Sequence, residues 1–322
     1  MKFIQISLIV IFLLLFVDKS KESPSFPTFL ILSIPIMEKM GEGVYKSNSE
    51  RVDNNFIRWL QASGADVIVV STFTPKKEIE ELLTKVNGII FQGNDLLTLE
   101  GSSYFNQALY LYERVKEIYD QSQGQIKIPL VAFGNDLSMI SEFVAGTNSI
   151  IKESVQVWLN EAIFINKTLA QDTILYSELD EDDMRSLEFL YHLPNELKFL
   201  VPFGHFDNNK HLKGAYHILT HSKTLYGINY VSSIQDKKYP IAGVTFRPEA
   251  TAFEQGVKPE TNPSWKSVKI SRFIGNSLVK HAMQNNRTMT IEEKKKYNFI
   301  DPYKDLPVII NGKYQHIFKR KK

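Results

Sequence analysis

The feature that most constrains the fold is a repeated alternation of buried strand-like runs and helix-like segments in the first half of the chain. Continuous apolar runs predict strands covered on both faces, and apolar residues at helical spacing predict the helices between them. The predicted strands are residues 28–35, 66–72, 87–92 and 128–133, and the predicted helices are residues 49–63, 75–86 and 103–121. Such alternation with short links is typical of an α/β fold with a mostly parallel central sheet flanked by helices.

The second half of the chain mixes further strands into this pattern. Residues 155–165, 216–220, 224–234 and 239–246 read as strands, and the last two as a hairpin. An acidic run at residues 180–183 opens a helix, where anions favour the N-terminus; capping is preferred over metal binding. Residues 265–283 form a closing helix. We therefore expect extra antiparallel strands in the second half and one domain spanning residues 24–284.

The two ends of the chain lie outside this domain. Residues 3–17 are almost uncharged and follow Lys2, so residues 1–23 are interpreted as a signal peptide. An uncleaved membrane tether through residues 3–17 is the alternative. Residues 285–322 form a basic C-terminal extension that ends in a solvated lysine- and arginine-rich cluster. The sequence thus predicts the secretory route, with an extracellular, lysosomal or vacuolar destination, or else a membrane-anchored protein.

Composition limits the chemistry that the chain can perform. A formal net charge of +2 argues against nucleic acid as the main partner. The chain contains 0 cysteines, which excludes disulfides, metal thiolates and a cysteine nucleophile. Its histidines have no metal-site spacing, and no phosphate loop or dinucleotide fingerprint is present, so no metal or cofactor is expected. Asn166 and Asn286 lie in Asn-x-Thr sequons and are candidate glycosylation sites.

A turn between strand and helix is the first candidate site. Residues 129–140 read PLVAFGNDLSMI, so a strand runs into Gly134, Asn135 and Asp136 and then into a helix. In many α/β hydrolases such a turn holds a nucleophile above the sheet. Here the turn carries neither cysteine nor serine at its apex.

Three motifs together resemble a known family. Residues 89–93 read IIFQG, the strand-turn-helix follows, and residues 239–249 read YPIAGVTFRPE. They are similar to the F-P-G-G, G-T-C-L-G-F and Y-P-V-Y-G-V-Q-W-H-P-E patterns of the γ-glutamyl hydrolases. Residues 56–70 (FIRWLQASGADVIVV) extend the resemblance. It implies a flavodoxin-like, class I glutamine amidotransferase-like fold, and a homodimer.

The resemblance also implies where catalytic residues would stand. The family's cysteine falls on Gly134 in a gapless register, or on Asp136 in a register shifted by two. The histidine falls on Arg247, which stays protonated and cannot act as a base. Glu249 keeps the position of the orienting glutamate, and we expect it to pair with Arg247 or to cap backbone. His205 matches a second active-site histidine.

The remaining candidate residues would bind ligand. The resemblance implies that the F-P-G-G pattern forms the family's oxyanion site. Gly93 keeps its first glycine, whereas Asn94 replaces the second, and Asn135 lies in the turn.

These residues predict a pseudoenzyme that lacks the cysteine nucleophile and the histidine base. It would act as a binding or scaffold module, or as a subunit of an assembly, for a protein partner or a small γ-glutamyl-like ligand. The alternative is a folate polyglutamate γ-glutamyl hydrolase with unusual residues, in which Asp136 or Ser138 replaces the cysteine.

Overall fold

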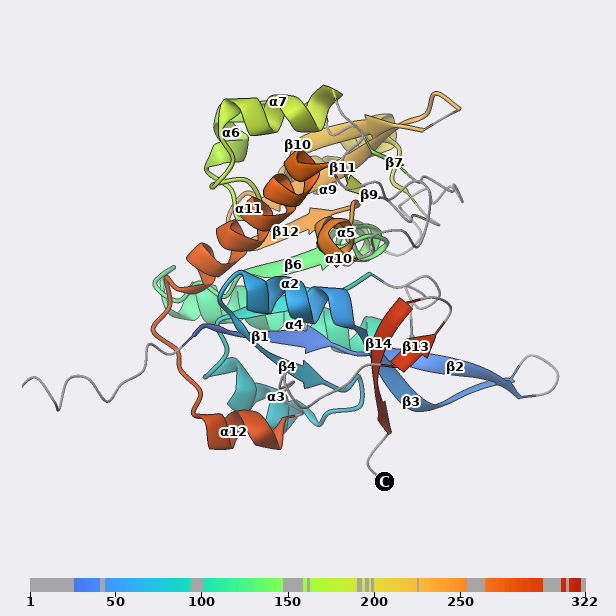
Figure 1. Ribbon diagram of the computed structural model, residues 1–322, viewed down its shortest axis with the longest axis vertical. Coiled ribbons are helices and arrows are strands. Elements are labelled where there is room, and N and C mark those ends of the chain that lie inside the picture. Colours follow the sequence, from blue (N-terminus) through green and yellow to red (C-terminus); the bar gives the residue numbers. More distant parts are fainter. Residues whose placement is uncertain are drawn as a thin grey trace, which may run out of the picture.

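The computed structural model describes most of the chain (Figure 1). The described residues are 26–40, 44–93, 101–146, 159–160, 163–189, 193–194, 197, 200–224, 226–253, 264–297, 308–310 and 313–319. Residues 1–23 and Asn94 lie outside them, as does most of the predicted strand 155–165, of which two short strands are described.

A central sheet organises the fold. Its parallel part has the spatial order β4 (Asp66–Val70), β1 (Thr28–Leu32), β5 (Gly88–Phe91), β6 (Leu130–Phe133) and β12 (Ile241–Val244). When these five strands are counted in chain order, the spatial order is 2-1-3-4-5, which is the flavodoxin-like arrangement. The predicted parallel sheet is therefore confirmed.

Three antiparallel strands extend this sheet beyond β12. They are β11 (Asn229–Asp236), β10 (Tyr216–Lys223) and β8 (Ile163–Phe164). β11 pairs with β12 as the predicted hairpin, although it begins five residues later than expected. The backbone N–H of Gly227 donates to the carbonyl of Thr224, so a turn occupies the start of the predicted strand. The expected antiparallel addition in the second half is confirmed.

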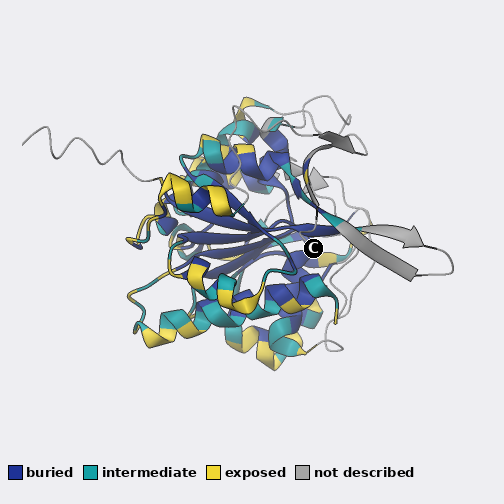
Figure 2. Ribbon diagram, turned by 90° about the horizontal axis from the view of Figure 1, so that it is seen from below, coloured by how far each residue is buried: buried dark blue, intermediate teal, exposed yellow. Residues whose placement is uncertain are grey.

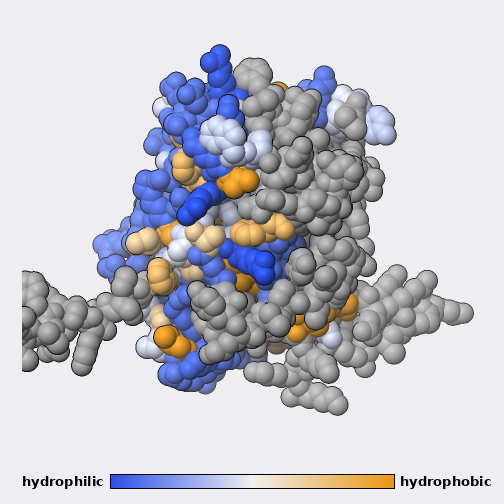
Figure 3. Space-filling view, in the orientation of Figure 1, coloured by the Kyte–Doolittle hydropathy of each residue, from blue (hydrophilic) through white to orange (hydrophobic). Residues whose placement is uncertain are grey.

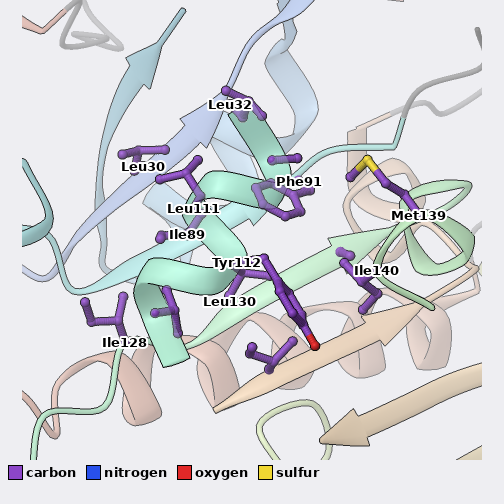
Figure 4. Packing of buried hydrophobic residues seen from close by; sticks show 14 of the residues in the cluster. Leu30, Leu32, Ile89, Phe91, Leu111, Tyr112, Ile128, Leu130, Met139 and Ile140 are labelled. Carbon is purple, nitrogen blue, oxygen red and sulfur yellow. The ribbon is translucent and has the colours of Figure 1, made fainter. Parts of the chain in front are cut away.

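Helices cover both faces of the sheet. Side chains of β1 alternate: Phe29 and Ile31 face α2 (Asn54–Ala62) and α11 (Trp265–Ala282), which lie on one face. Leu30 and Leu32 face the other side, where α3 (Lys76–Leu83), α4 (Ser103–Gln121) and α5 (Asp136–Ala145) pack. Figure 2 shows the buried sheet between helices whose outer faces are exposed, and Figure 4 shows the core on the α4 and α5 side.

The other helices and short strands lie around this core. They are α6 (Lys167–Gln171), α7 (Glu181–Phe189), α8 (Phe203–Asn208), α9 (Lys210–Ala215), α10 (Pro248–Phe253), α12 (Ile291–Lys296), β7 (Leu159–Asn160) and β9 (Leu193–Pro194). The acidic run does open a helix, since the carboxylate of Asp180 accepts from the backbone N–H of Asp183, 2.7 Å away.

One predicted helix is wrong at its start. Residues 49–53 are the end of β3 (Val44–Asp53), which belongs to a second, four-stranded sheet. In that sheet β3 lies between β2 (Ile34–Met40) and β14 (Lys313–Lys319), and β13 (Val308–Ile310) pairs with β14. Helix α2 begins only after Asp53, whose carboxylate accepts from the backbone N–H of Asn55 and caps the helix.

The chain beyond α11 packs back onto the domain. The side-chain amide of Asn285 donates to the carbonyls of Asn87 and Lys127, and the Asn87 amide donates to the side chain of Asn285. Further on, Lys294 pairs with Asp66 at the start of β4. The described part of the predicted extension is thus held by buried contacts to strands and loops of the first half.

On the face seen in Figure 3, much of the described surface is polar. Figure 3 shows hydrophilic side chains with small apolar patches between them. Within the residues that the structure describes, no helix is long and apolar enough to cross a membrane.

Candidate functional site

The candidate site lies where the parallel strands end. The strands that follow β1 in the chain lie on opposite sides of it, β4 on one side and β5 on the other. Ligands of open α/β sheets bind at the carboxyl ends of the strands beside such a switch point. Gln92, directly after β5, bridges this place. Its amide donates to the carbonyl of Leu32 at 2.9 Å and its oxygen accepts from the backbone N–H of Asp53 at 2.8 Å.

The turn between β6 and α5 (Gly134 and Asn135), together with Asp136 as the first residue of α5, is called the elbow from here on. Gly134 has φ +57, in the left-handed region. Its N–H donates to the carbonyl of Val244 at 2.8 Å, so the elbow is fixed to the end of β12. A Cβ added to Gly134 would have, in the described part of the chain, only the Cα of Gly93 within 4 Å, at 3.7 Å. The elbow therefore has the sharp backbone of a nucleophile turn and room for a side chain.

Gly93 passes against the elbow from the neighbouring strand end. It has φ +82, and a Cβ there would lie 2.8 Å from the carbonyl oxygen of Phe133. Real Cβ atoms do not approach a backbone oxygen so closely, so only glycine fits this position. The close passage directs the Gly93 N–H toward the first turn of α5.

Asp136 accepts that N–H. Its side chain is fully buried, and its Oδ2 atom lies 2.9 Å from the nitrogen of Gly93 and 2.6 Å from the hydroxyl oxygen of Tyr104. Burial, together with the Asp136 carboxylate, raises the pKa of Tyr104 well above its ordinary value, so the hydroxyl remains a donor. The position of Asp136 in the first turn of α5 also favours a negative charge.

Arg247 stands between two carboxylates. Its Nη2 atom lies 2.7 Å from Oδ2 of Asp53 and its Nε atom 2.7 Å from Oε1 of Glu249. The side chains of all three are largely withdrawn from water, with 9%, 14% and 0% exposure for Arg247, Asp53 and Glu249. The expected ion pair between Arg247 and Glu249 is present, and Asp53 adds a second. A guanidinium held in this way donates hydrogen bonds and cannot accept a proton.

These residues form one connected network. Asp136 binds Gly93, which follows Gln92; Gln92 binds the backbone of Asp53, and the Asp53 carboxylate binds Arg247. The candidate residues at the elbow and at residues 247–249 are therefore brought together.

Two of the other candidates belong to the elbow and to α5, and the third lies on α8. Asn135 is buried in the elbow, and Ser138 is buried on α5. His205 is half-buried in α8, which packs against the start of β11 and so lies at the same edge of the sheet.

The two sequon asparagines are exposed. Asn166 caps α6, its side-chain oxygen accepting from the backbone N–H of Leu169 at 2.9 Å, and its amide nitrogen is not used in that bond. Asn286 is exposed just after the buried Asn285. In the described ranges, no group of three or more histidine, cysteine, aspartate or glutamate residues could hold a metal ion.

Sequence reasoning missed three members of the network: Asp53, Gln92 and Tyr104. Asp53 stands before two asparagines at the true start of α2, which is a helix-capping signal that the longer predicted helix obscured. Gln92 and Tyr104 carry no signal of their own, because tertiary packing alone brings them to the site.

Comparison with known proteins points to one group of hydrolases. No protein-family model matches the chain. It is 24% identical over 281 residues to "Gamma-glutamyl hydrolase 2" of Arabidopsis thaliana, covering 86% of this chain and 78% of that protein. It is 23% identical to the "Gamma-glutamyl hydrolase" of Mus musculus (80% and 78% covered) and 22% identical to that of Homo sapiens (80% and 80%).

Solved structures of glutamine amidotransferases also match. One from Methylobacillus flagellatus has a TM-score of 0.45 at 9% identity and covers 83% of this chain and 98% of its own. One from Thermotoga maritima has a TM-score of 0.41 at 9% identity, covering 80% and 98%. By sequence, the chain is γ-glutamyl hydrolase-like: it is distantly similar to the γ-glutamyl hydrolases over most of its length.

Removing the Arg247 charge is expected to destabilise the folded protein. In Arg247→Leu the Asp53 and Glu249 carboxylates lose a common partner inside the protein, which we expect to lower the free energy of unfolding by about 3–5 kcal/mol. Arg58→Leu on the exposed face of α2 is the matched control and is expected to change it by less than about 0.5 kcal/mol. Urea denaturation of both variants measures the difference. Equal effects would show that the two ion pairs contribute nothing beyond surface electrostatics.

Proposed function

We propose that this chain is a γ-glutamyl hydrolase-like pseudoenzyme, which binds a ligand or a protein partner and does not cleave γ-glutamyl bonds. The observation that carries the proposal is the elbow: it has the backbone of a nucleophile turn, with Gly134 at its apex. A glycine offers no group that can attack an amide carbon. The absence of cysteine from the whole chain is consistent with this loss.

The geometry supports the gapless match of the family's cysteine to Gly134. Gly134 occupies the left-handed position directly after β6, where a nucleophile would project above the sheet. Asp136 is already the first residue of α5. In this match Asp136 stands at the second glycine of the G-T-C-L-G-F pattern.

A general base is missing from the corresponding place. Arg247 stands where the family has histidine, and both of its neighbouring carboxylates are engaged in ion pairs with it. Activation of a weak nucleophile requires a group that accepts its proton, and an arginine cannot do so at neutral pH. Glu249 is therefore assigned a structural role, as the partner of Arg247.

The two candidate substitutes are poorly suited to amide cleavage. The carboxylate of Asp136 is fully buried and is held by Gly93 and Tyr104. Ser138 is buried in α5, and its hydroxyl would need a base to become reactive. This favours the pseudoenzyme over a hydrolase with unusual residues.

The proposed ligand site is the same edge of the sheet, beside the elbow. A small γ-glutamyl-like molecule would contact the strand ends around Gly93 and Asn135, with His205 at the margin. A protein partner, or a second copy of the chain, would instead use the outer surface.

Hydrolysis is the first test. Incubation with a folate carrying a γ-linked glutamate chain, at mildly acidic and neutral pH, is expected to release no glutamate above the buffer blank. The active γ-glutamyl hydrolase of Mus musculus serves as the positive control. Turnover by this chain that is abolished in Glu249→Gln would contradict the proposal. Binding without turnover would raise the unfolding temperature as the concentration of the same compound increases.

We further propose that the protein travels the secretory route and carries glycans on Asn166 and Asn286. Both side chains are exposed, as an oligosaccharide requires. Expression in a eukaryotic secretory host is expected to give a product whose mobility on gel electrophoresis increases after treatment with a peptide-N-glycosidase. Each single change, Asn166→Gln and Asn286→Gln, should remove one glycan. A product unaffected by the glycosidase would contradict the glycosylation proposal.

A further inference from the structure

The carboxylate of Asp136 lies where an anionic ligand would be expected. Backbone N–H groups directed into a nucleophile turn normally bind the oxygen of a reacting carbonyl. Here the N–H of Gly93, fixed by a backbone passage that only glycine permits, donates to Asp136 at 2.9 Å. The donor is therefore already occupied by a side chain of the same molecule.

Two further features favour a negatively charged oxygen at this point. The hydroxyl of Tyr104 provides a second donor at 2.6 Å, and its raised pKa keeps its proton in place. The first turn of α5, a helix of 10 residues, contributes the positive end of a helix dipole. Hydrogen bonds that involve an ionised acceptor are roughly twice as strong as those between neutral groups.

An acceptor attached to the chain also competes well against one in solution. The fold holds Asp136 within hydrogen-bonding distance of the Gly93 N–H, so its effective concentration there is high whatever the concentration of free ligand. An external carboxylate or carbonyl oxygen would have to displace a fully buried side chain from both donors.

We propose that Asp136 is a built-in ligand of the oxyanion position, which occupies the Gly93 N–H and keeps external carbonyl and carboxylate oxygens out. This inference rests on the proposed relation of the elbow to a hydrolase site. It adds a second barrier to catalysis, independent of the missing nucleophile. It also specifies ligand chemistry: a molecule bound at these strand ends does not place its carbonyl or carboxylate on the Gly93 amide.

The test observes the Gly93 amide directly and does not depend on turnover. Glycine labelling with nitrogen-15 gives at most 16 backbone signals, among which Gly93 is assigned by triple-resonance spectra of the unmodified protein. In the unmodified protein we expect sodium acetate to leave this signal unmoved, compared with sodium chloride at equal ionic strength. In Asp136→Gly the signal should shift upfield as the carboxylate is lost, and acetate should return it downfield in a saturable manner.

Two other variants complete the design. Asp136→Asn keeps the shape of the side chain and removes the charge, so the Gly93 signal should shift while acetate has no effect. Asp120→Asn removes an exposed carboxylate that pairs with Lys238 and should leave the signal unchanged.

Three results would overturn the inference. They are a saturable response of the unmodified protein to acetate, an unmoved Gly93 signal in both Asp136 variants, and an Asp136→Gly protein that responds equally to acetate and chloride. If Asp136→Gly does not fold, Asp136→Asn alone decides, because an unmoved signal there contradicts the proposed bond. Failure of the pseudoenzyme proposal would appear separately, as glutamate release.

Discussion

The backbone passage of Gly93 against the end of β6 is the constraint on which the rest of the site depends. A side chain at position 93 would collide with the carbonyl of Phe133, so the two strand ends can meet only through a glycine. This contact aims the Gly93 N–H at α5 and sets the distance at which Asp136 can accept it. Among the described residues, a Cβ added to Gly134 would make only ordinary contact with the Cα of Gly93. Backbone geometry suited to a nucleophile thus coexists with a glycine at the apex, which has no side chain that could attack.

Internal pairing occupies the polar groups that a reactive site would present to substrate. Asp136 engages the amide of Gly93, and Arg247 engages Asp53 and Glu249. Removing one partner of such a buried pair leaves the other charge without a partner in a region withdrawn from water, which lowers stability. The network therefore ties the ends of β5, β6 and β12 to the start of α2.

The sequence predicted the parts of the structure that depend on local pattern. Helix α4 was predicted with its observed limits, because Ser102 caps its start and apolar residues recur along one face. The pairing of β14 with β3 was not predicted, since it joins segments at opposite ends of the chain: His316 and Asn54, which contact each other at 3.0 Å, are 262 residues apart. The spacing of apolar residues and their helix propensity carry no information about strand partners so far away in the chain. The predicted helix therefore included the last five residues of β3.

The site likewise contains residues that the sequence identified and residues that only the tertiary structure brings in. Motifs identified Gly93, Gly134, Arg247 and Glu249, because each stands at a fixed position after a strand. The contacts that define their present roles come from Asp53 and Tyr104, which reach the site through α2 and α4. Whether Asp136 lies at the apex of the turn or inside the helix could not be decided from spacing alone, and the φ of +57 at Gly134 distinguishes the two.

The most direct test of the central claim, that the described residues leave room for a side chain at position 134 although glycine stands there, is a comparison of two glycine substitutions. Gly134→Ala and Gly93→Ala both place a Cβ at positive φ, which costs roughly 1–2 kcal/mol of unfolding free energy. Only Gly93→Ala adds a collision with backbone, for which we expect a further loss of about 1–3 kcal/mol. The account predicts that urea denaturation finds Gly93→Ala clearly less stable than Gly134→Ala. Equal losses, or a larger loss at Gly134, would contradict it.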